Sequence, residues 1–137
     1  MKNIIVAAGV LINENGDLLI TERPPGKNMS GFWEFPGGKL EGSETPELAL
    51  VRELKEELEI IVLTTYLKPL TFITHEYPQF NLLMLVYILR KWEGNPVSAE
   101  KQKLAWVSKE RLQEYDMLPA DKPIISILTT QNFNPKY

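Results

Sequence analysis

The stretch Gly37–Ile60, GGKLEGSETPELALVRELKEELEI, decides more about this chain than any other segment. It predicts a helix that begins at Thr45-Pro46-Glu47 and ends near Leu58. Threonine suits the N-cap, proline the first helical position, and an acid the first turn. A glycine turn and one further acid, Glu44, precede this helix, so the segment joins a tight backbone turn to a charged helix.

Three acids of this helix, Glu53, Glu56 and Glu57, fall on one stripe, because successive helical residues advance by about 100°. Like charges at these spacings repel each other, so the stripe suggests a bound cation that offsets the repulsion. Mg²⁺ takes oxygen ligands of this kind and commonly shares them with a phosphate substrate. We therefore expect the acids to face outward toward a cleft, opposite an apolar buried face. The residues expected on that buried face are Leu48, Val51, Leu54 and Leu58.

The composition narrows the class of protein. A chain of 137 residues with 44% hydrophobic content can bury one core, and we expect a single domain over residues 1–137. Cysteine is absent, so the sequence holds no disulfide framework and no thiolate site. The apolar run Ile4 to Ile12 is too short for a membrane span and no secretory signal pattern is present, so we expect a cytoplasmic protein without a membrane partner. The net charge of −3 offers no attraction for polymeric nucleic acid.

The pattern of apolar and turn residues predicts an α+β fold, a mixed β-sheet sandwiched between α-helices. The expected strands are Ile4–Ile12, Leu18–Thr21, Trp33–Phe35, Ile61–Ile73, Phe80–Trp92 and Leu104–Val107. Turn residues between the first two strands predict a hairpin. Pro36-Gly37-Gly38 is expected to stop the third strand, and His75–Pro78 to form a loop between the two long ones. A short helix capped by its serine is expected over Ser108–Tyr115, and a C-terminal helix over Asp121–Thr130.

The spacing of the segment resembles the Nudix box, the signature of hydrolases that act on nucleoside diphosphates linked to another group. Its six invariant positions are matched by Gly38, Glu44, Arg52, Glu53, Glu56 and Glu57. One position departs, because Glu59 stands where the family has glycine. Glycine there suits a left-handed helix cap, which costs another residue about 1–2 kcal/mol. Either Glu59 tolerates this strain or the helix ends differently, and we expect a cost in stability rather than lost catalysis.

Chemistry and this resemblance together suggest roles for the box. Glu56, Glu57 and the Gly38 carbonyl are expected to bind Mg²⁺, with Mn²⁺ as a substitute. Glu53 is either another metal ligand or the general base that deprotonates water. Arg52 is expected to fix the carboxylate of Glu56, four residues further on, by a charge-assisted hydrogen bond. Glu44 is expected to be a structural acid outside the metal's immediate shell.

The resemblance extends to the MutT branch of the family and covers most of the chain. The matching segments outside the helix are Val6–Val10, Thr21–Arg23, Trp33–Lys39, Gly42–Glu47, Trp92–Gly94 and Leu118–Ile124. It implies hydrolysis of 8-oxo-dGTP to the monophosphate and pyrophosphate by attack at the β-phosphorus, which protects DNA from mutation by sanitising the nucleotide pool. The substrate is then a nucleoside triphosphate, and we expect a monomeric enzyme.

The family resemblance also suggests roles in substrate or metal binding for five residues outside the helix. The resemblance places Arg23, Phe35 and Phe80 near the substrate and Glu100 near the metal. Asp121 stands where well-known MutT enzymes have asparagine, and an ionised aspartate only accepts hydrogen bonds. It is equally well explained as the N-cap of the last helix. The aspartate leaves open a CTP or 5-hydroxy-CTP pyrophosphohydrolase as the alternative. A non-catalytic nucleotide-binding module is disfavoured by the complete set of acids.

Overall fold

The computed structural model describes residues 2–130. The elements in this range are β1 (Lys2–Leu11), β2 (Leu18–Glu22), β3 (Trp33–Glu34), β4 (Gly37–Lys39), α1 (Pro46–Leu58), β5 (Lys68–Tyr77), β6 (Phe80–Leu89), β7 (Lys103–Val107) and α2 (Lys122–Thr130), with the 3-10 turns η1 (Thr64–Tyr66), η2 (Lys109–Glu114) and η3 (Pro119–Asp121). None of the helices in the described part of the chain has the length and apolar content that a membrane crossing requires.

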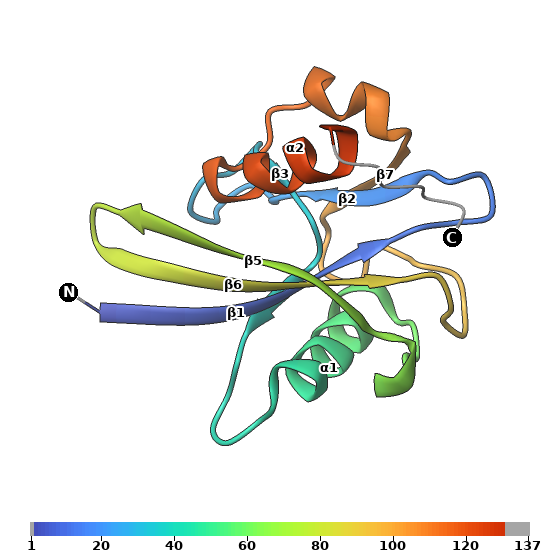
Figure 1. The fold of residues 1–137 in the computed structure, drawn as a ribbon, viewed down its shortest axis with the longest axis horizontal. Helices are drawn as coiled ribbons and strands as arrows, with labels where there is room; N and C mark the ends of the chain where they lie inside the picture. Colours follow the sequence, from blue (N-terminus) through green and yellow to red (C-terminus); the bar gives the residue numbers. More distant parts are fainter. Residues whose placement is uncertain (1, 131–137) are drawn as a thin grey trace.

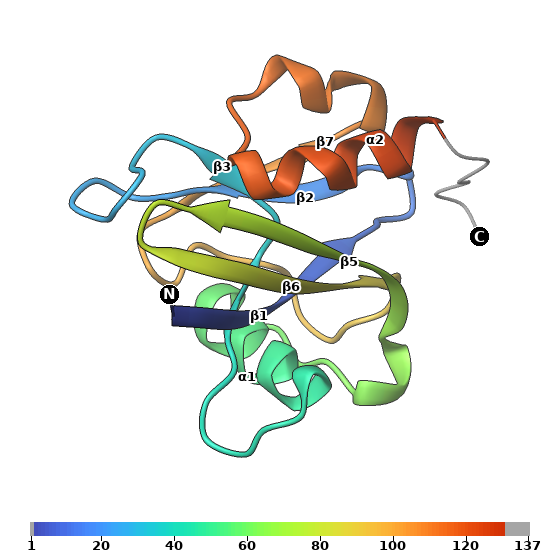
Figure 2. The same ribbon diagram turned by 60° about the vertical axis from the view of Figure 1, so that its left-hand side comes forward.

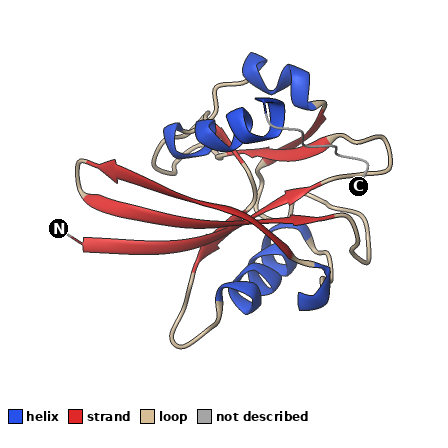
Figure 3. Ribbon diagram, in the orientation of Figure 1, coloured by secondary structure: helices blue, strands red, loops and turns tan. Residues whose placement is uncertain are grey.

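Two sheets and two α-helices form the layers of the molecule (Figure 1). Within residues 2–130, one sheet is four-stranded and mixed, in the order β4-β1-β6-β5, and the other is three-stranded and antiparallel, in the order β3-β2-β7. Helix α1 covers the outer face of the four-stranded sheet, whereas α2 lies on the side of the three-stranded sheet (Figures 2 and 3). The expectation of a mixed sheet between helices is confirmed.

The expected hairpin between the first two strands is wrong. Strand β1 pairs with β6 in parallel along its whole length and with β4 at its centre, so both of its edges are occupied. The chain therefore crosses to the other sheet after β1, and only an isolated bridge joins Ile12 to Leu18. The turn itself forms as expected, because the Asn13 side chain accepts hydrogen bonds from the backbone N–H groups of Asn15 and Asp17.

Several other expected elements begin or end at different residues in the structure. The long strand expected from Ile61 is interrupted by η1 and begins only at Lys68. The expected loop at His75–Pro78 is mostly strand, because β5 pairs with β6 as far as Tyr77 and Phe80. Two rings of this hairpin are in contact: those of His75 and Tyr77 lie 4.4 Å apart between centroids and are tilted by 59°. Ser108 makes no side-chain capping hydrogen bond to the 3-10 turn that follows it, so the expected serine cap is wrong.

The hydrophobic core lies on both sides of the four-stranded sheet, since side chains of a strand alternate between its faces. Ala8 and Val10 of β1 pack toward the three-stranded sheet and α2, whereas Ala7 and Leu11 pack toward α1. The glycines after Pro36, which were expected to stop the third strand, form the short strand β4 alongside β1. A Cβ on Gly37 would overlap the backbone of Ala7 and Ala8, so this close approach requires glycine. The pairing fixes the glycine turn against the sheet.

Candidate active site

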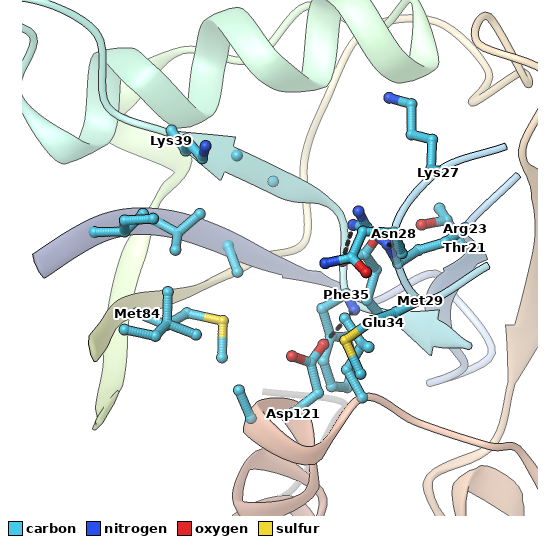
Figure 4. Close-up of a pocket in the computed structure, with 18 of the residues that line it drawn as sticks. Thr21, Arg23, Lys27, Asn28, Met29, Glu34, Phe35, Lys39, Met84 and Asp121 are labelled. Carbon is cyan, nitrogen blue, oxygen red and sulfur yellow. Dashed lines mark hydrogen bonds and ion pairs between the residues drawn. The ribbon is translucent and has the colours of Figure 1, made fainter. Parts of the chain in front are cut away.

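A cavity of about 660 Å³ opens between the two sheets and collects residues from most of the strands. One side of it carries Glu57, Glu100 and Gly38, and its lining also includes Arg23, Phe35, Phe80 and Asp121. We call Glu53, Glu57 and Glu100 with Gly38 the acidic wall, and Arg23, Phe35, Phe80 and Asp121 the mixed wall. In Figure 4, Lys39, which follows Gly38, and Asp121 lie on opposite sides of the view.

Helix α1 is held at both ends as its sequence predicts. The Thr45 hydroxyl accepts a hydrogen bond from the Leu48 N–H at 3.2 Å, and Pro46 opens the first turn. The helix ends at Leu58 because Glu59 takes a left-handed conformation, with φ 57° and ψ 36°, and its N–H donates to the Lys55 carbonyl. Of the two alternatives for Glu59, the structure has the strained left-handed cap.

The expected orientation of the helix is partly wrong. Leu48 is 52% exposed, whereas Ala49 and Leu50 are fully buried. At about 100° per residue, Glu53 and Glu57 project between the directions of Ala49 and Leu50 rather than opposite the buried face. The Glu53 side chain is only 16% exposed, while that of Glu56 is 53% exposed. Two acids of the stripe thus turn inward toward the sheet, and the third remains at the surface.

Gly38 is placed directly beside Glu53. A Cβ at this position would overlap the Glu53 carboxylate, so the missing side chain of Gly38 leaves room for this carboxylate next to β4. Gly38 is in register with Ala7 of β1, which fixes its position relative to the sheet. Backbone and carboxylate oxygens therefore meet at one place.

Arg52 links the parts of the box. Its guanidinium donates two hydrogen bonds to Glu44, at 2.7 and 2.9 Å, in a bidentate pair. It also donates to Glu53 at 3.0 Å and to the Lys39 carbonyl at 3.0 Å. The expected hydrogen bond from Arg52 to Glu56 is present but longer, at 3.4 Å. The shorter bonds to Glu44 and Glu53 were not expected, and the structural role of Glu44 stays a prediction.

The electrostatics of the acidic wall indicate a site suited to a cation. Burial, reinforced by the charges of Glu53, Glu34 and Glu100, raises the pKa of Glu57 to about 9. Burial also raises the pKa of Glu53, against the opposing effect of Arg52. These all-oxygen donors fit Mg²⁺ or Mn²⁺, which would remove the repulsion. Among residues 2–130, no three acidic, histidine or cysteine side chains converge closely enough to enclose a metal ion.

The mixed wall gathers residues that are nearly 100 positions apart in the sequence. Asp121 is 4% exposed, and its Oδ2 accepts a hydrogen bond from the Phe35 N–H at 2.8 Å (Figure 4). Burial raises the pKa of Asp121 to about 8. Phe35 is buried beside it, and Phe80 stacks on Tyr77 with 5.1 Å between ring centroids. All four residues assigned to the substrate line the one cavity.

Two residues of this cavity, Glu34 and Gln102, were not predicted from the sequence. Glu34 pairs with Arg23 at 3.2 Å, and burial raises the pKa of Glu34 while Arg23 opposes this shift. Arg23 is further held by its Nε, which donates to the Asn28 carbonyl at 2.7 Å. Gln102 is buried near Glu100 and Glu57. The available signal for Glu34 was an acid between two aromatic residues of a short strand, Trp33 and Phe35.

Comparisons with known proteins agree with this architecture. The model of the NUDIX domain family matches residues 7–126. The 8-oxo-dGTP diphosphatase of Escherichia coli strain K12 is 37% identical over 128 residues, which cover 93% of this chain and 98% of that protein. The CTP pyrophosphohydrolase of the same strain is 34% identical over 125 residues, 91% of this chain and 90% of that protein. The chain therefore belongs to the Nudix domain family and is a Nudix hydrolase.

A solved structure supports the same assignment. It comes from a structure and function study of MutT from Aliivibrio salmonicida and Vibrio cholerae, with a TM-score of 0.80 and 33% sequence identity. The alignment covers 95% of this chain and 99% of that chain. The likeness extends over both sheets and both helices, so the resemblance expected from the box and its flanking segments is confirmed.

Proposed function

We propose that this protein hydrolyses 8-oxo-dGTP to 8-oxo-dGMP and pyrophosphate, and so removes a mutagenic nucleotide from the cytoplasmic pool. One observation carries the proposal: the partly buried carboxylate of Glu53 stands beside Gly38, and Gly38 and Glu57 line a cavity whose mixed wall holds Asp121. The acidic wall suits metal-assisted cleavage of a phosphoanhydride. The relative named 8-oxo-dGTP diphosphatase, which spans nearly the whole chain, supports this choice of substrate.

Gly38, Glu53, Glu56, Glu57 and Glu100 would hold Mg²⁺, with Mn²⁺ as a substitute. When bound, the metal supplies charge neutralisation for the phosphate oxygens and lowers the pKa of a coordinated water. Glu53 either completes this ligand set or takes the proton from the attacking water, and its hydrogen bond from Arg52 fixes its orientation for both roles. Glu56 reaches the metal from the surface after a rotamer change, which its 53% exposed side chain allows.

Water attacks the β-phosphorus, and the oxygen that bridges the α- and β-phosphorus atoms leaves with the monophosphate. Arg23, fixed by Glu34 and the Asn28 carbonyl, binds the nucleotide. Hydrolysis in ¹⁸O-labelled water tests the site of attack. The proposal requires the label in pyrophosphate, and label in the monophosphate contradicts attack at the β-phosphorus.

Asp121 is the base-reading residue of the proposal. One carboxylate oxygen is occupied by the Phe35 N–H, which leaves the other for the base. With its pKa raised to about 8, the carboxyl holds a proton at neutral pH and both donates and accepts, as an asparagine does. This favours a purine with both a carbonyl and N–H groups on its edge, such as 8-oxoguanine. The hydrogen bond from Phe35 supports a role for Asp121 beyond that of a helix cap, and the two roles are compatible.

A cytidine triphosphate is the second candidate, supported by the relative named CTP pyrophosphohydrolase and by the aspartate itself. A pyrophosphate-release assay over 8-oxo-dGTP, dGTP, CTP, 5-hydroxy-CTP and dATP separates the two. We expect 8-oxo-dGTP to have the highest kcat/KM, and EDTA to abolish release from every nucleotide. A lead for a cytidine nucleotide assigns the second function. Release that persists without metal contradicts the proposed chemistry.

The protein is further proposed to act as a monomer on free nucleotides. Its net charge of −3 gives no attraction for a nucleic-acid backbone. Sedimentation with and without a DNA duplex tests both points, because a dimer or a comigrating complex contradicts them.

A further inference from the structure

Gln102 stands out among the buried polar residues of the described chain because its side chain joins two segments of the acidic wall. It is 7% exposed and lies between the end of α1 and the loop that carries Glu100. Its Nε2 donates to the Glu57 carbonyl at 2.8 Å, and its Oε1 accepts from the Glu100 N–H at 2.9 Å. Both ends of the amide are therefore used, each on the backbone of an acid that we assign to the metal.

The loop around Gln102 is built to dock on the end of the helix. The Ala99 N–H donates to the Glu57 carbonyl at 3.1 Å, and the Val97 N–H donates to the Leu58 carbonyl at 3.0 Å. These contacts satisfy helix carbonyls that would otherwise lack partners. Lys101 takes a left-handed φ of 65°, which turns the chain so that Gln102 folds back toward Glu100. Ser98 reinforces the arrangement, since its hydroxyl contacts both the carbonyl and the Oε1 of Gln102.

Packing alone does not explain why position 102 carries a side-chain amide. The Glu57 carbonyl already has a partner in Ala99, so an apolar side chain at position 102 would leave this acceptor paired. What only an amide provides is a simultaneous bond to the Glu100 backbone. The two acids lie close enough for the charge of Glu100 to raise the pKa of Glu57, so the distance between them matters for a shared cation.

We propose that Gln102 is a positioning residue that holds Glu100 at a fixed distance from Glu57 and thereby sets the metal affinity of the site. It touches neither substrate nor metal. The proposal rests on the proposed function, because it takes Glu57 and Glu100 as metal ligands. Residues that orient metal ligands typically contribute 10- to 100-fold to affinity.

The test is calorimetric titration of the nucleotide-free protein with Mn²⁺. We expect Gln102→Leu to weaken Mn²⁺ binding about 10-fold, while the KM for the nucleotide at saturating metal stays within about twofold of wild type. Gln113→Leu, the same change at an exposed position in η2, is the matched control and leaves both constants unchanged. Gln102→Glu keeps an acceptor for Glu100 but loses the donor to Glu57, and is also expected to weaken binding. It serves as the second variant if Gln102→Leu does not fold.

A double-mutant comparison shows whether Gln102 acts through Glu100. Glu100→Gln should weaken Mn²⁺ binding, and adding Gln102→Leu or Gln102→Glu to it should change affinity by less than about twofold, because the positioned ligand is already lost. An equal loss in both backgrounds overturns the proposal, as does unchanged Mn²⁺ affinity in the single variants. If wild type itself binds no Mn²⁺, the proposed function fails and not merely this role of Gln102.

Discussion

The acidic wall and the mixed wall of the cavity are built in different ways. Most of the acidic wall comes from one continuous segment, in which Gly38 and the acids of α1 are brought together by a turn and a helix. The mixed wall takes Arg23, Phe35, Phe80 and Asp121 from separate elements. A local segment brings together the residues assigned to hydrolysis, whereas long-range packing brings together the residues assigned to substrate selection. In this account the acidic wall hydrolyses the phosphoanhydride and the mixed wall determines which nucleotide is bound.

The largest expected effect comes from Glu53→Gln in the acidic wall. We expect kcat to fall about 1,000-fold on every nucleotide, because the variant loses a general base or a charged metal ligand. Initial rates of pyrophosphate release measure this, with Glu110→Gln on exposed η2 as the control. Activity within tenfold of wild type would remove Glu53 from the reaction and weaken the division between the two walls.

Arg52→Lys tests how the acidic wall is held in place. A lysine cannot reproduce the bidentate pair with Glu44 together with the bonds to Glu53 and the Lys39 carbonyl. We expect kcat to fall about tenfold and the free energy of unfolding to fall by about 2 kcal/mol. Urea denaturation and initial rates measure the two effects.

Arg111→Lys is the matched control for Arg52→Lys. Arg111 pairs with Glu114 on the surface, where its side chain is 67% exposed, so we expect no measurable change in stability or rate. If both substitutions behave alike, the contacts of Arg52 do not organise the acidic wall.

Asp121→Asn tests the mixed wall through the pH dependence of stability. The pKa of Asp121 is about 8 in the folded protein, against about 3.9 in an unfolded chain. Between these values the folded state keeps a proton that the unfolded state has released. The contribution of Asp121 is therefore fully present below about pH 4 and is lost as the pH rises through about 8. We expect Asp121→Asn to gain about 1 kcal/mol or more relative to wild type between pH 5 and pH 8.

Urea denaturation of both proteins at pH 5, 6, 7 and 8 measures this difference. Comparing the variant with wild type cancels the titration of Glu57, whose pKa is also raised. A difference in unfolding free energy that stays constant with pH would show that Asp121 is ionised in the folded protein. In that case the carboxyl could not donate to a base at neutral pH.

The smallest expected effect is a gain in stability outside both walls. Glu59 ends α1 in a left-handed conformation that glycine adopts without strain. We expect Glu59→Gly to raise the free energy of unfolding by about 1 kcal/mol and to leave kcat and KM unchanged. Thermal and urea denaturation measure the gain. A loss of activity would mean that the helix end helps to place Glu57, and the acidic wall would then extend beyond its acids.

The local features of the fold follow from the sequence. The start and end of α1 and the turn at Asn13 depend on residues within a few positions of each other, and both were predicted. The left-handed conformation of Glu59 was one of two alternatives that the sequence left open. The pairing of β1 was not predicted, because its partners β4 and β6 lie far along the chain. Strand patterns identify which residues are extended but not which strands lie next to them.

In the candidate site too, local features were predicted from the sequence and features that depend on long-range packing were not. The spacing of the box identified the acids, but the direction that α1 presents to the sheet depends on packing, so Leu48 was wrongly placed in the core. Arg52 was assigned to Glu56 by helical spacing, whereas a turn brings Glu44 within its reach. Gln102 carries no local signal, and the only one for Glu34 is its place between two aromatic residues, since the roles of both arise from contacts across the fold. The mixed wall could be proposed only from the family resemblance.

The most direct test of the two-wall account is the ratio of kcat/KM for 8-oxo-dGTP to that for 5-hydroxy-CTP, measured in wild type, Glu53→Gln and Asp121→Ala. The account predicts that Glu53→Gln lowers both values by the same factor and leaves the ratio unchanged. Asp121→Ala removes the groups that donate to and accept from the base, and should shift the ratio at least tenfold, since a pair of base contacts is worth about 1–3 kcal/mol, while kcat on the better substrate stays close to wild type. A ratio that changes with Glu53→Gln, or one that stays constant with Asp121→Ala, would contradict it.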